Sequence, residues 1–228
     1  MMLDIRLRTA AEMVPENARL ADIGSDHAYL PIALCLENKI GCALASDINE
    51  GPVAAAVANI HKNRLDAKIT ALKADGLDAA QAFAPDCITV LGMGGELIVS
   101  ILDKAKWIRD SKITLILQPM THPEILAKYL AEQGFAAIDE RIVCDGGRDD
   151  RIYRLIGAKY DGVRRNISEV DALVGRANLE RGDRVTHAYV NKLIRTFETR
   201  INGKLRSAQN ADREIGVVDE LKKELNII

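Results

Sequence analysis

The chain has 228 residues, enough for one ordinary domain with a substantial core and a smaller addition. Apolar residues make up 48% and charged residues 28%, the balance of a soluble globular protein. No stretch is long and apolar enough to suggest a membrane span or a signal peptide, and the four cysteines lack the spacing of metal ligands. We therefore expect a cytoplasmic protein with reduced thiols, no bound metal and no membrane contact.

The formal net charge of −2 is distributed unevenly. Residues 162–228 contain 13 Lys and Arg against 10 Asp and Glu, a net +3, whereas the rest of the chain contains 18 against 23, a net −5. This weak bias favours an anionic partner for the C-terminal part and indicates nothing more specific.

Strands and helices alternate through the first two thirds of the chain. Helical spacing of apolar residues predicts a first helix within residues 1–14, ended by Pro15. A short apolar strand follows at 20–23, with a turn at Gly24 and a helix through Leu36. We predict further strands at 42–47, 69–74, 87–91 and 113–117, and helices at 50–62, 95–102 and 123–132.

Residues 135–143 and 152–158 face each other across the glycine-containing segment 145–150, which predicts a β-hairpin. Five strand–helix units followed by a hairpin predict an α/β fold, a doubly wound sheet with an antiparallel strand near one end. Such a terminal hairpin is characteristic of Rossmann-like class I methyltransferases rather than of dehydrogenases. We assign residues 1–160 to this sheet domain.

Only helical spacing remains beyond residue 165. We predict a helix at 167–179, a long amphipathic helix marked by apolar residues between 190 and 205, and another between 215 and 225. A turn near 208–212 would pair the last two as an antiparallel hairpin. Residues 161–228 therefore form a C-terminal helical domain, which either packs on the sheet domain, pairs with a second copy in a homodimer, or takes part in recognition.

The first strand and its turn, DIGSDHAYLP at 22–31, predict a ligand site, because open α/β sheets bind ligands where strands end and helices begin. A dinucleotide site would need G-x-G-x-x-G, but this turn supplies only Gly24, with Asp26 where the second glycine would stand. An acidic Asp26 suits a cationic or zwitterionic ligand better than a diphosphate.

Asp47 ends the second strand, where a carboxylate usually accepts hydrogen bonds from ribose hydroxyls. S-adenosylmethionine has a ribose, an adenine and a zwitterionic tail but no phosphate, so it fits this pair of features. The alternative is that Asp22, Asp26 and Asp47 only cap turns and helices.

Five segments, DIGSDHAYLP at 22–31, DINEGP at 47–52, ADGL at 74–77, LGMGGELI at 91–98 and LILQP at 115–119, resemble the bacterial tRNA (adenine-22-N1)-methyltransferases, the TrmK family. The helical tail is similar to the coiled-coil-like extension of that family. The chain departs from the family at Met120, where members often carry asparagine. The resemblance implies methyl transfer from S-adenosylmethionine to N1 of an adenine in tRNA.

The residue types after the fourth strand agree with N1 as the target. Enzymes that methylate adenine N6 commonly present an Asn- or Asp-Pro-Pro-aromatic clamp there, whereas this chain has only the segment 92–95, GMGG. Ring N1 already carries an in-plane lone pair, so it needs mainly positioning, desolvation and a nearby carboxylate.

The resemblance and the strand-end positions together give the candidate site. The expected cofactor-binding residues are Gly24, Ser25, Asp26, His27, Asp47, Ile48, Asn49, Asp75, Gly76, Met93 and Gly94. Asp26 is also the candidate catalytic carboxylate, since it could stabilise the cationic product or accept a proton from N6. Tyr29 is the second catalytic candidate, for which stacking on a flipped base and packing at the head of a helix remain equal alternatives.

Two other functions fit the same residues. One is methylation of a small molecule, with the tail as a lid or dimer interface. The other is a nucleoside-binding protein without catalysis. No residue is proposed as a metal ligand.

Overall fold

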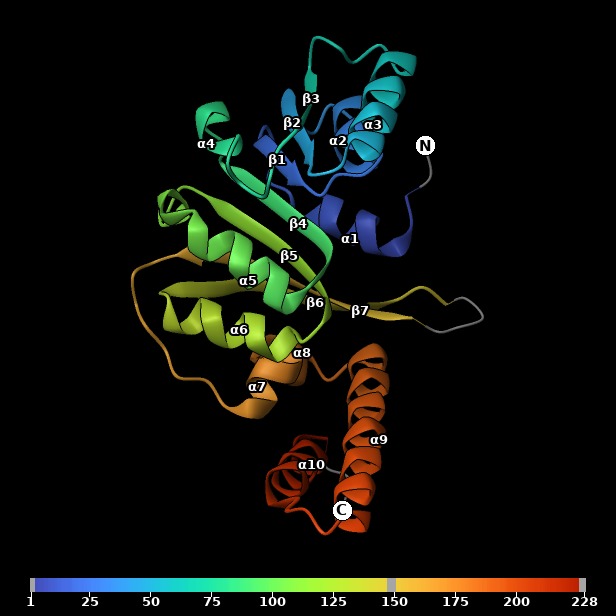
Figure 1. Cartoon of the computed structure of the whole chain (residues 1–228), viewed down its shortest axis with the longest axis vertical. Coiled ribbons are helices and arrows are strands. Elements are labelled where there is room, and N and C mark those ends of the chain that lie inside the picture. The colour runs from blue at the N-terminus through green and yellow to red at the C-terminus, as the bar shows by residue number, and fades with distance from the viewer. Residues whose placement is uncertain (1–2, 147–150, 226–228) are drawn as a thin grey trace.

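The protein is described by a computed structural model over residues 3–146 and 151–225, in which one sheet carries helices on both faces (Figure 1). The sheet has the strand order β3-β2-β1-β4-β5-β7-β6. Its strands are β1 (Arg19–Ile23), β2 (Cys42–Asp47), β3 (Ile69–Lys73), β4 (Cys87–Gly94), β5 (Thr114–Thr121), β6 (Phe135–Cys144) and β7 (Ile152–Tyr160). The described helices are α1 (Ile5–Met13), α2 (Tyr29–Leu36), α3 (Glu50–Lys62), α4 (Ala80–Phe83), α5 (Gly95–Lys104), η1 (Lys106–Ile108), α6 (Pro123–Glu132), α7 (Glu169–Val174), α8 (Arg176–Arg181), α9 (Arg184–Arg206) and α10 (Asp212–Glu224).

The predicted antiparallel strand near one end is confirmed. It is β7, which pairs antiparallel with both β5 and β6. All pairs among the first five strands are parallel, namely β1 with β2, β1 with β4, β2 with β3 and β4 with β5. Part of the connection between β6 and β7, predicted as the hairpin turn, lies outside the described residues.

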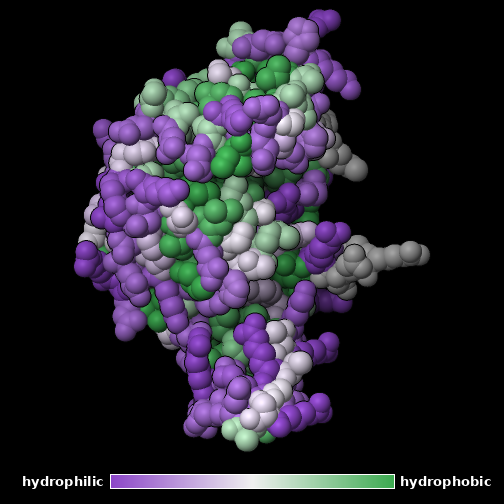
Figure 2. Space-filling view, in the orientation of Figure 1, coloured by the Kyte–Doolittle hydropathy of each residue, from purple (hydrophilic) through white to green (hydrophobic). Residues whose placement is uncertain are grey.

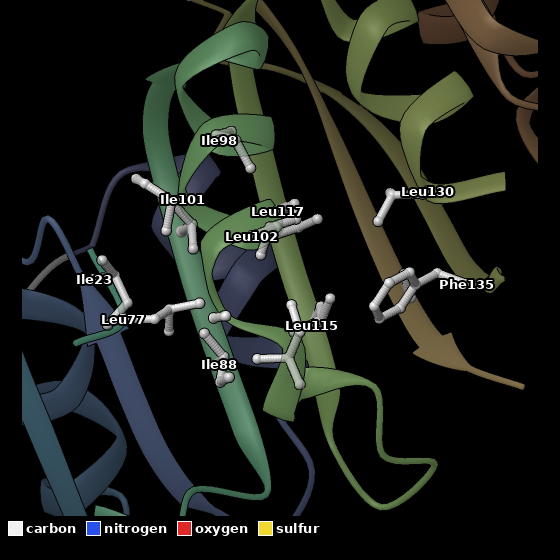
Figure 3. Close-up of a cluster of buried hydrophobic side chains, with 14 of the residues drawn as sticks. Ile23, Leu77, Ile88, Ile98, Ile101, Leu102, Leu115, Leu117, Leu130 and Phe135 are labelled. Atoms are coloured by element: carbon white, nitrogen blue, oxygen red, sulfur yellow. The ribbon is translucent and has the colours of Figure 1, made fainter. Parts of the chain in front are cut away.

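Two apolar clusters hold helices against the two faces of the sheet. Along β5, Leu115 and Leu117 belong to the cluster under α5 and α6, and Ile116 between them belongs to the cluster under α1, α2 and α3. Figure 3 shows the first cluster, with the α5 side chains turned onto β4 and β5. Because both faces are covered, the central strands are largely apolar, with Asp22, Thr89 and Gln118 among their few buried polar residues. Each fully buried Leu or Ile stabilises the fold by about 1.5–3 kcal/mol.

The predicted helix over 167–179 is wrong, because Gly175 divides it into α7 and α8. Gly175 has φ +90°, a left-handed conformation that favours glycine. A Cβ at this position would stand 2.4 Å from Oε2 of Glu140 on β6, so the close approach of the tail to the sheet also requires glycine.

The predicted helical hairpin of the tail is confirmed as α9 and α10. Asp183 caps α9 by accepting a hydrogen bond of 2.7 Å from the N–H of Thr186. The tail packs on the sheet domain, since Ile142 of β6 shares an apolar cluster with Val190, Phe197 and other tail residues. Figure 2 shows a mostly hydrophilic outer surface over the tail, at the bottom of the view. Within the described residues, none of the helices has the length and apolarity needed to cross a bilayer.

Candidate functional site

The turn after β1 is fixed to the end of β2. The N–H groups of Gly24 and Ser25 both donate to the carbonyl oxygen of Ser46, at 2.8 and 2.9 Å. Gly24 has φ +70° and Asp26 has φ +46°, so the chain reverses sharply between strand and helix. The turn therefore lies at the edge of the sheet where the parallel strands end, as the sequence predicts.

The buried Asp22 holds this turn in place. The sequence analysis considered Asp22 only as a residue that caps a turn or a helix. Its buried carboxylate accepts hydrogen bonds from Ser25 Oγ at 2.5 Å and from Thr89 Oγ1 at 2.6 Å. Burial raises the pKa of Asp22, and the two hydroxyl donors and the charge of Arg6 oppose that rise. A carboxylate inside an otherwise apolar strand was the available signal for this role.

Asp26, His27 and Tyr29 form the exposed rim of the same turn. The Asp26 side chain is 65% exposed, and its Oδ2 lies 3.5 Å from Nε2 of His27. The rings of His27 and Tyr29 are stacked, with centroids 5.1 Å apart and planes inclined by 19°. Tyr29 is 41% exposed, so the alternative of core packing is excluded. A carboxylate beside a planar aromatic pair suits a heterocyclic base.

Asp47, Ile48 and Asn49 follow β2. Oδ1 of Asp47 accepts hydrogen bonds from the backbone N–H of Asn49 at 2.9 Å and from its side chain at 3.3 Å. Within the described chain Oδ2 makes no hydrogen bond, so this oxygen can accept from a ligand hydroxyl. Ile48 is 56% exposed and gives an apolar surface beside the carboxylate. The pair fits a ribose with an attached base.

Asp75 and Gly76 follow β3 and are joined to the β2 segment, because the N–H of Ala74 donates to the carbonyl of Asp47 at 3.0 Å. Gly76 has φ +52° and packs against Ile101. A cavity of about 250 Å³ borders both residues and extends to Lys104 and Trp107. Neither Gly24 nor Asp47 lines that cavity, so it lies apart from the expected ribose position.

The end of β4 closes on the β1 turn. A Cβ on Gly24 would stand 2.1 Å from Cε of Met93, so the Met93 side chain lies directly against Gly24. The pairing of β4 with β5 shifts register on both sides of Met93. Gly95 lies just as close to the loop after β5, since a Cβ on Gly95 would stand 2.2 Å from the carbonyl oxygen of His122.

The structure thus brings the expected site residues to one edge of the sheet. Four successive strand ends contribute them, and carboxylates rather than cations dominate. The turn after β1 supplies only Gly24 of the glycines that a dinucleotide-binding loop needs, which agrees with a ligand that has a ribose and a zwitterionic tail and no phosphate. Among the described residues there is no group of three or more His, Cys, Asp or Glu that could hold a metal ion.

Residues 3–156 match a family model described as a methyltransferase domain. The tRNA (adenine(22)-N(1))-methyltransferase of Bacillus subtilis is 38% identical over 168 residues, which are 71% of this chain and 69% of that protein.

Solved structures extend the similarity to the tail. The B. subtilis tRNA methyltransferase TrmK is 30% identical, with a TM-score of 0.81 over 99% of this chain and 97% of that one. A Streptococcus pneumoniae protein solved in complex with S-adenosyl-L-methionine is 28% identical, with a TM-score of 0.86 over 98% of this chain and 100% of that one.

Proposed function

The chain belongs to the family of tRNA (adenine(22)-N(1))-methyltransferases, and we propose that it methylates N1 of adenine 22 in tRNA with S-adenosylmethionine as donor. The observation that carries the proposal is the edge formed by four strand ends, with Asp47 free to accept from a ribose and Met93 against Gly24. A tRNA substrate implies that the protein acts in the cytoplasm.

We assign the cofactor to the segments after β1, β2 and β3. The methionine part lies along Gly24, Ser25 and His27, and the ribose hydroxyls donate to Asp47. The adenine lies near Asp75 and Gly76, with Ile48 as an apolar neighbour and Asn49 at the margin. Met93 lies against Gly24 and, with Gly94, borders the methionine part on the side of the methyl acceptor. The available Oδ2 of Asp47 and the apolar surface of Ile48 support this assignment. When bound, S-adenosylmethionine supplies a methyl group on a sulfonium centre.

The reaction needs a correctly placed acceptor rather than a strong base. The N1 lone pair forms the new bond to the methyl carbon while the sulfur–carbon bond breaks and its electrons stay on sulfur. The adenine ring becomes cationic, and the exposed carboxylate of Asp26 stabilises that charge or accepts a proton from N6. Tyr29, stacked on His27, offers a face for the target base.

The tail is the proposed contact for the rest of the tRNA, with residues 1–160 as the catalytic domain and 161–228 as the helical domain. A groove of about 370 Å³ lies between Thr121 and His122 of the sheet domain and Lys192 and Arg200 of α9. It begins beside the end of β5, next to the candidate site. Its lining also includes three carboxylates, of which Glu169 is paired with Arg213 and Glu214 with Lys204. Lys192 and Arg200, which have no ion pair with described residues, are the cations available to a phosphate backbone.

Incubation of a cellular tRNA pool with labelled S-adenosylmethionine, followed by nucleoside mapping, tests the proposal. We expect label in 1-methyladenosine. A panel of small heterocyclic acceptors serves as the comparison, because label there and none in tRNA would favour a small-molecule methyltransferase. Cofactor binding without transfer to any acceptor would favour a nucleoside-binding protein.

A further inference from the structure

The end of β4, residues 92–95, borders the place proposed for the methyl acceptor. A side chain from α1, distant in the sequence, packs against it. Gly92, at the end of β4, has φ +80°, and a Cβ there would stand 2.7 Å from Nη1 of Arg6 in α1. The Arg6 guanidinium therefore occupies the volume that a side chain at position 92 would fill.

Gln118 joins Arg6 to the β4 turn. Its side chain is fully buried, and its Oε1 accepts from the backbone N–H of Gly92 at 3.0 Å and from Nη1 of Arg6 at 3.3 Å. Its Nε2 donates to the carbonyl of Pro119 at 2.9 Å. The carboxamide thus satisfies the Gly92 N–H at the register shift, where a ladder bond to β5 would otherwise be expected.

Arg6 is not an ordinary surface arginine. Its side chain is only 23% exposed, and its ion pair with Asp4 is long, at 3.7 Å. Arg8, two residues further along the same helix, is exposed and makes no side-chain hydrogen bond or ion pair with described residues. The contrast indicates that α1 directs one particular cation to the strand-end edge.

We propose that Arg6 is a positioning residue for the methyl acceptor: with Gln118 it holds the Gly92 turn, and through Met93 it sets the wall against which the target base is placed. This inference rests on the proposed function. Among the described residues Arg6 makes no hydrogen bond or ion pair with the Gly24 turn or with Asp47. Its charge acts on the buried Asp22 only at longer range, and Ser25 and Thr89 still hold that carboxylate by hydrogen bonds. Loss of Arg6 should therefore affect turnover much more than cofactor binding.

Kinetics of Arg6→Leu, Arg6→Lys and the control Arg8→Leu test the proposal. For Arg6→Leu we expect kcat on tRNA to fall at least tenfold, the calorimetric Kd for S-adenosylmethionine to change less than threefold, and the thermal midpoint to change little. Arg6→Lys keeps the charge and a donor, so it should recover part of kcat. Arg8→Leu should match the wild type.

A spectroscopic readout separates this inference from the proposed function. The methyl resonance of Met93, assigned by its loss in Met93→Leu, should shift in Arg6→Leu but not in Arg8→Leu in protein with labelled methionine methyl groups. The proposal is overturned by wild-type kcat in Arg6→Leu, by proportional losses of kcat, cofactor affinity and thermal stability in both Arg6 variants, or by an unmoved Met93 resonance. If the wild type itself fails to methylate tRNA, the proposed function fails, and the Met93 resonance still decides whether Arg6 holds the turn.

Discussion

Met93 at the end of β4 lies directly against Gly24 in the turn after β1, with its Cε 2.1 Å from the position of a Cβ on Gly24. Two segments almost seventy residues apart in sequence thus share one boundary of the site, and the absence of a side chain on Gly24 makes the contact possible. A change of conformation at Gly24, in the turn proposed to bind the cofactor, should therefore also displace Met93 at the end of β4.

Gly24→Ala should weaken cofactor binding at least tenfold and destabilise the fold. Alanine at φ +70° costs about 1–2 kcal/mol, and its methyl group displaces Met93. Gly41→Ala is the matched control, because its Cβ would meet nothing within 4 Å. Calorimetry and thermal unfolding check both; equal cofactor affinity in the two variants would contradict the assigned position of the cofactor.

Asp47→Ala should remove hydrogen bonds from ribose hydroxyls to a charged acceptor. Each is worth roughly 1.5–3 kcal/mol in gross terms and less in net affinity, so we expect affinity to fall about tenfold or more. The exposed Asp66→Ala is the control. Unchanged calorimetric affinity in Asp47→Ala would remove Asp47 from the site.

The buried Asp22 should leave a pH signature on stability. Burial raises its folded pKa above the ordinary value of 3.8, so the fold favours the protonated form. Its contribution to the free energy of unfolding should therefore fall as the pH rises from about that value through the folded pKa. Asp22→Asn cannot titrate, so the variant should gain stability relative to the wild type over this range. If the free energy of unfolding of Asp22→Asn minus that of the wild type stays constant or decreases as the pH rises, Asp22 does not have a raised pKa in the folded protein.

Charge reversal on the tail should weaken tRNA binding and flatten its salt dependence. Lys204 is a poor choice, because its Nζ pairs with Glu214 at 2.6 Å and reversal would disrupt the tail itself. Arg195 and Arg206 are exposed and have no ion pair with described residues. Arg195→Glu with Arg206→Glu should lower the salt slope by roughly 1 for each phosphate that the protein no longer neutralises.

The control for these tail variants is Lys112→Glu. Lys112 is exposed and precedes the start of β5, whereas the groove beside the tail begins at the end of that strand. Wild-type affinity and salt slope in the double variant would mean that the tail serves another purpose, such as pairing with a second copy of the chain.

Asp26→Asn distinguishes two roles of one carboxylate. An amide keeps hydrogen bonding but cannot neutralise a developing positive charge, so a part in catalysis predicts a lower kcat that extra cofactor does not restore. A part in cofactor binding predicts a higher cofactor KM with kcat nearly unchanged. We expect the first result; wild-type kcat and cofactor affinity would leave Asp26 as a turn residue alone.

Much of the fold could be predicted because its signals are local. Apolar runs indicated the strands, Gly24 indicated the first turn, and Asp47 marked the second strand end. The break at Gly175 was missed, since the spacing of Val170, Leu173 and Leu179 continues across it. The Glu140 carboxylate that leaves no room for a Cβ at Gly175 is distant in the sequence. Tertiary contacts determine where such a helix break falls, and these contacts cannot be derived from the spacing of residues in a single sequence.

The same limit applied to the site. Residues that lie at strand ends could be named from sequence, whereas those that act through a partner could not. Asp22 is defined by Ser25 and Thr89, and Arg6 is defined by Gln118, 112 residues away. Both are polar side chains aimed inward from an apolar strand or an amphipathic helix, and only the fold shows what they meet.

Methyl transfer to N1 of one adenine is tested by comparing two tRNA transcripts that differ only at position 22. Each is incubated with labelled S-adenosylmethionine and digested for nucleoside analysis. We expect 1-methyladenosine, approaching one label per molecule, in the transcript with adenine at that position, and background label in the transcript with guanine there. Equal labelling of both transcripts, or label in a nucleoside other than 1-methyladenosine, would contradict it.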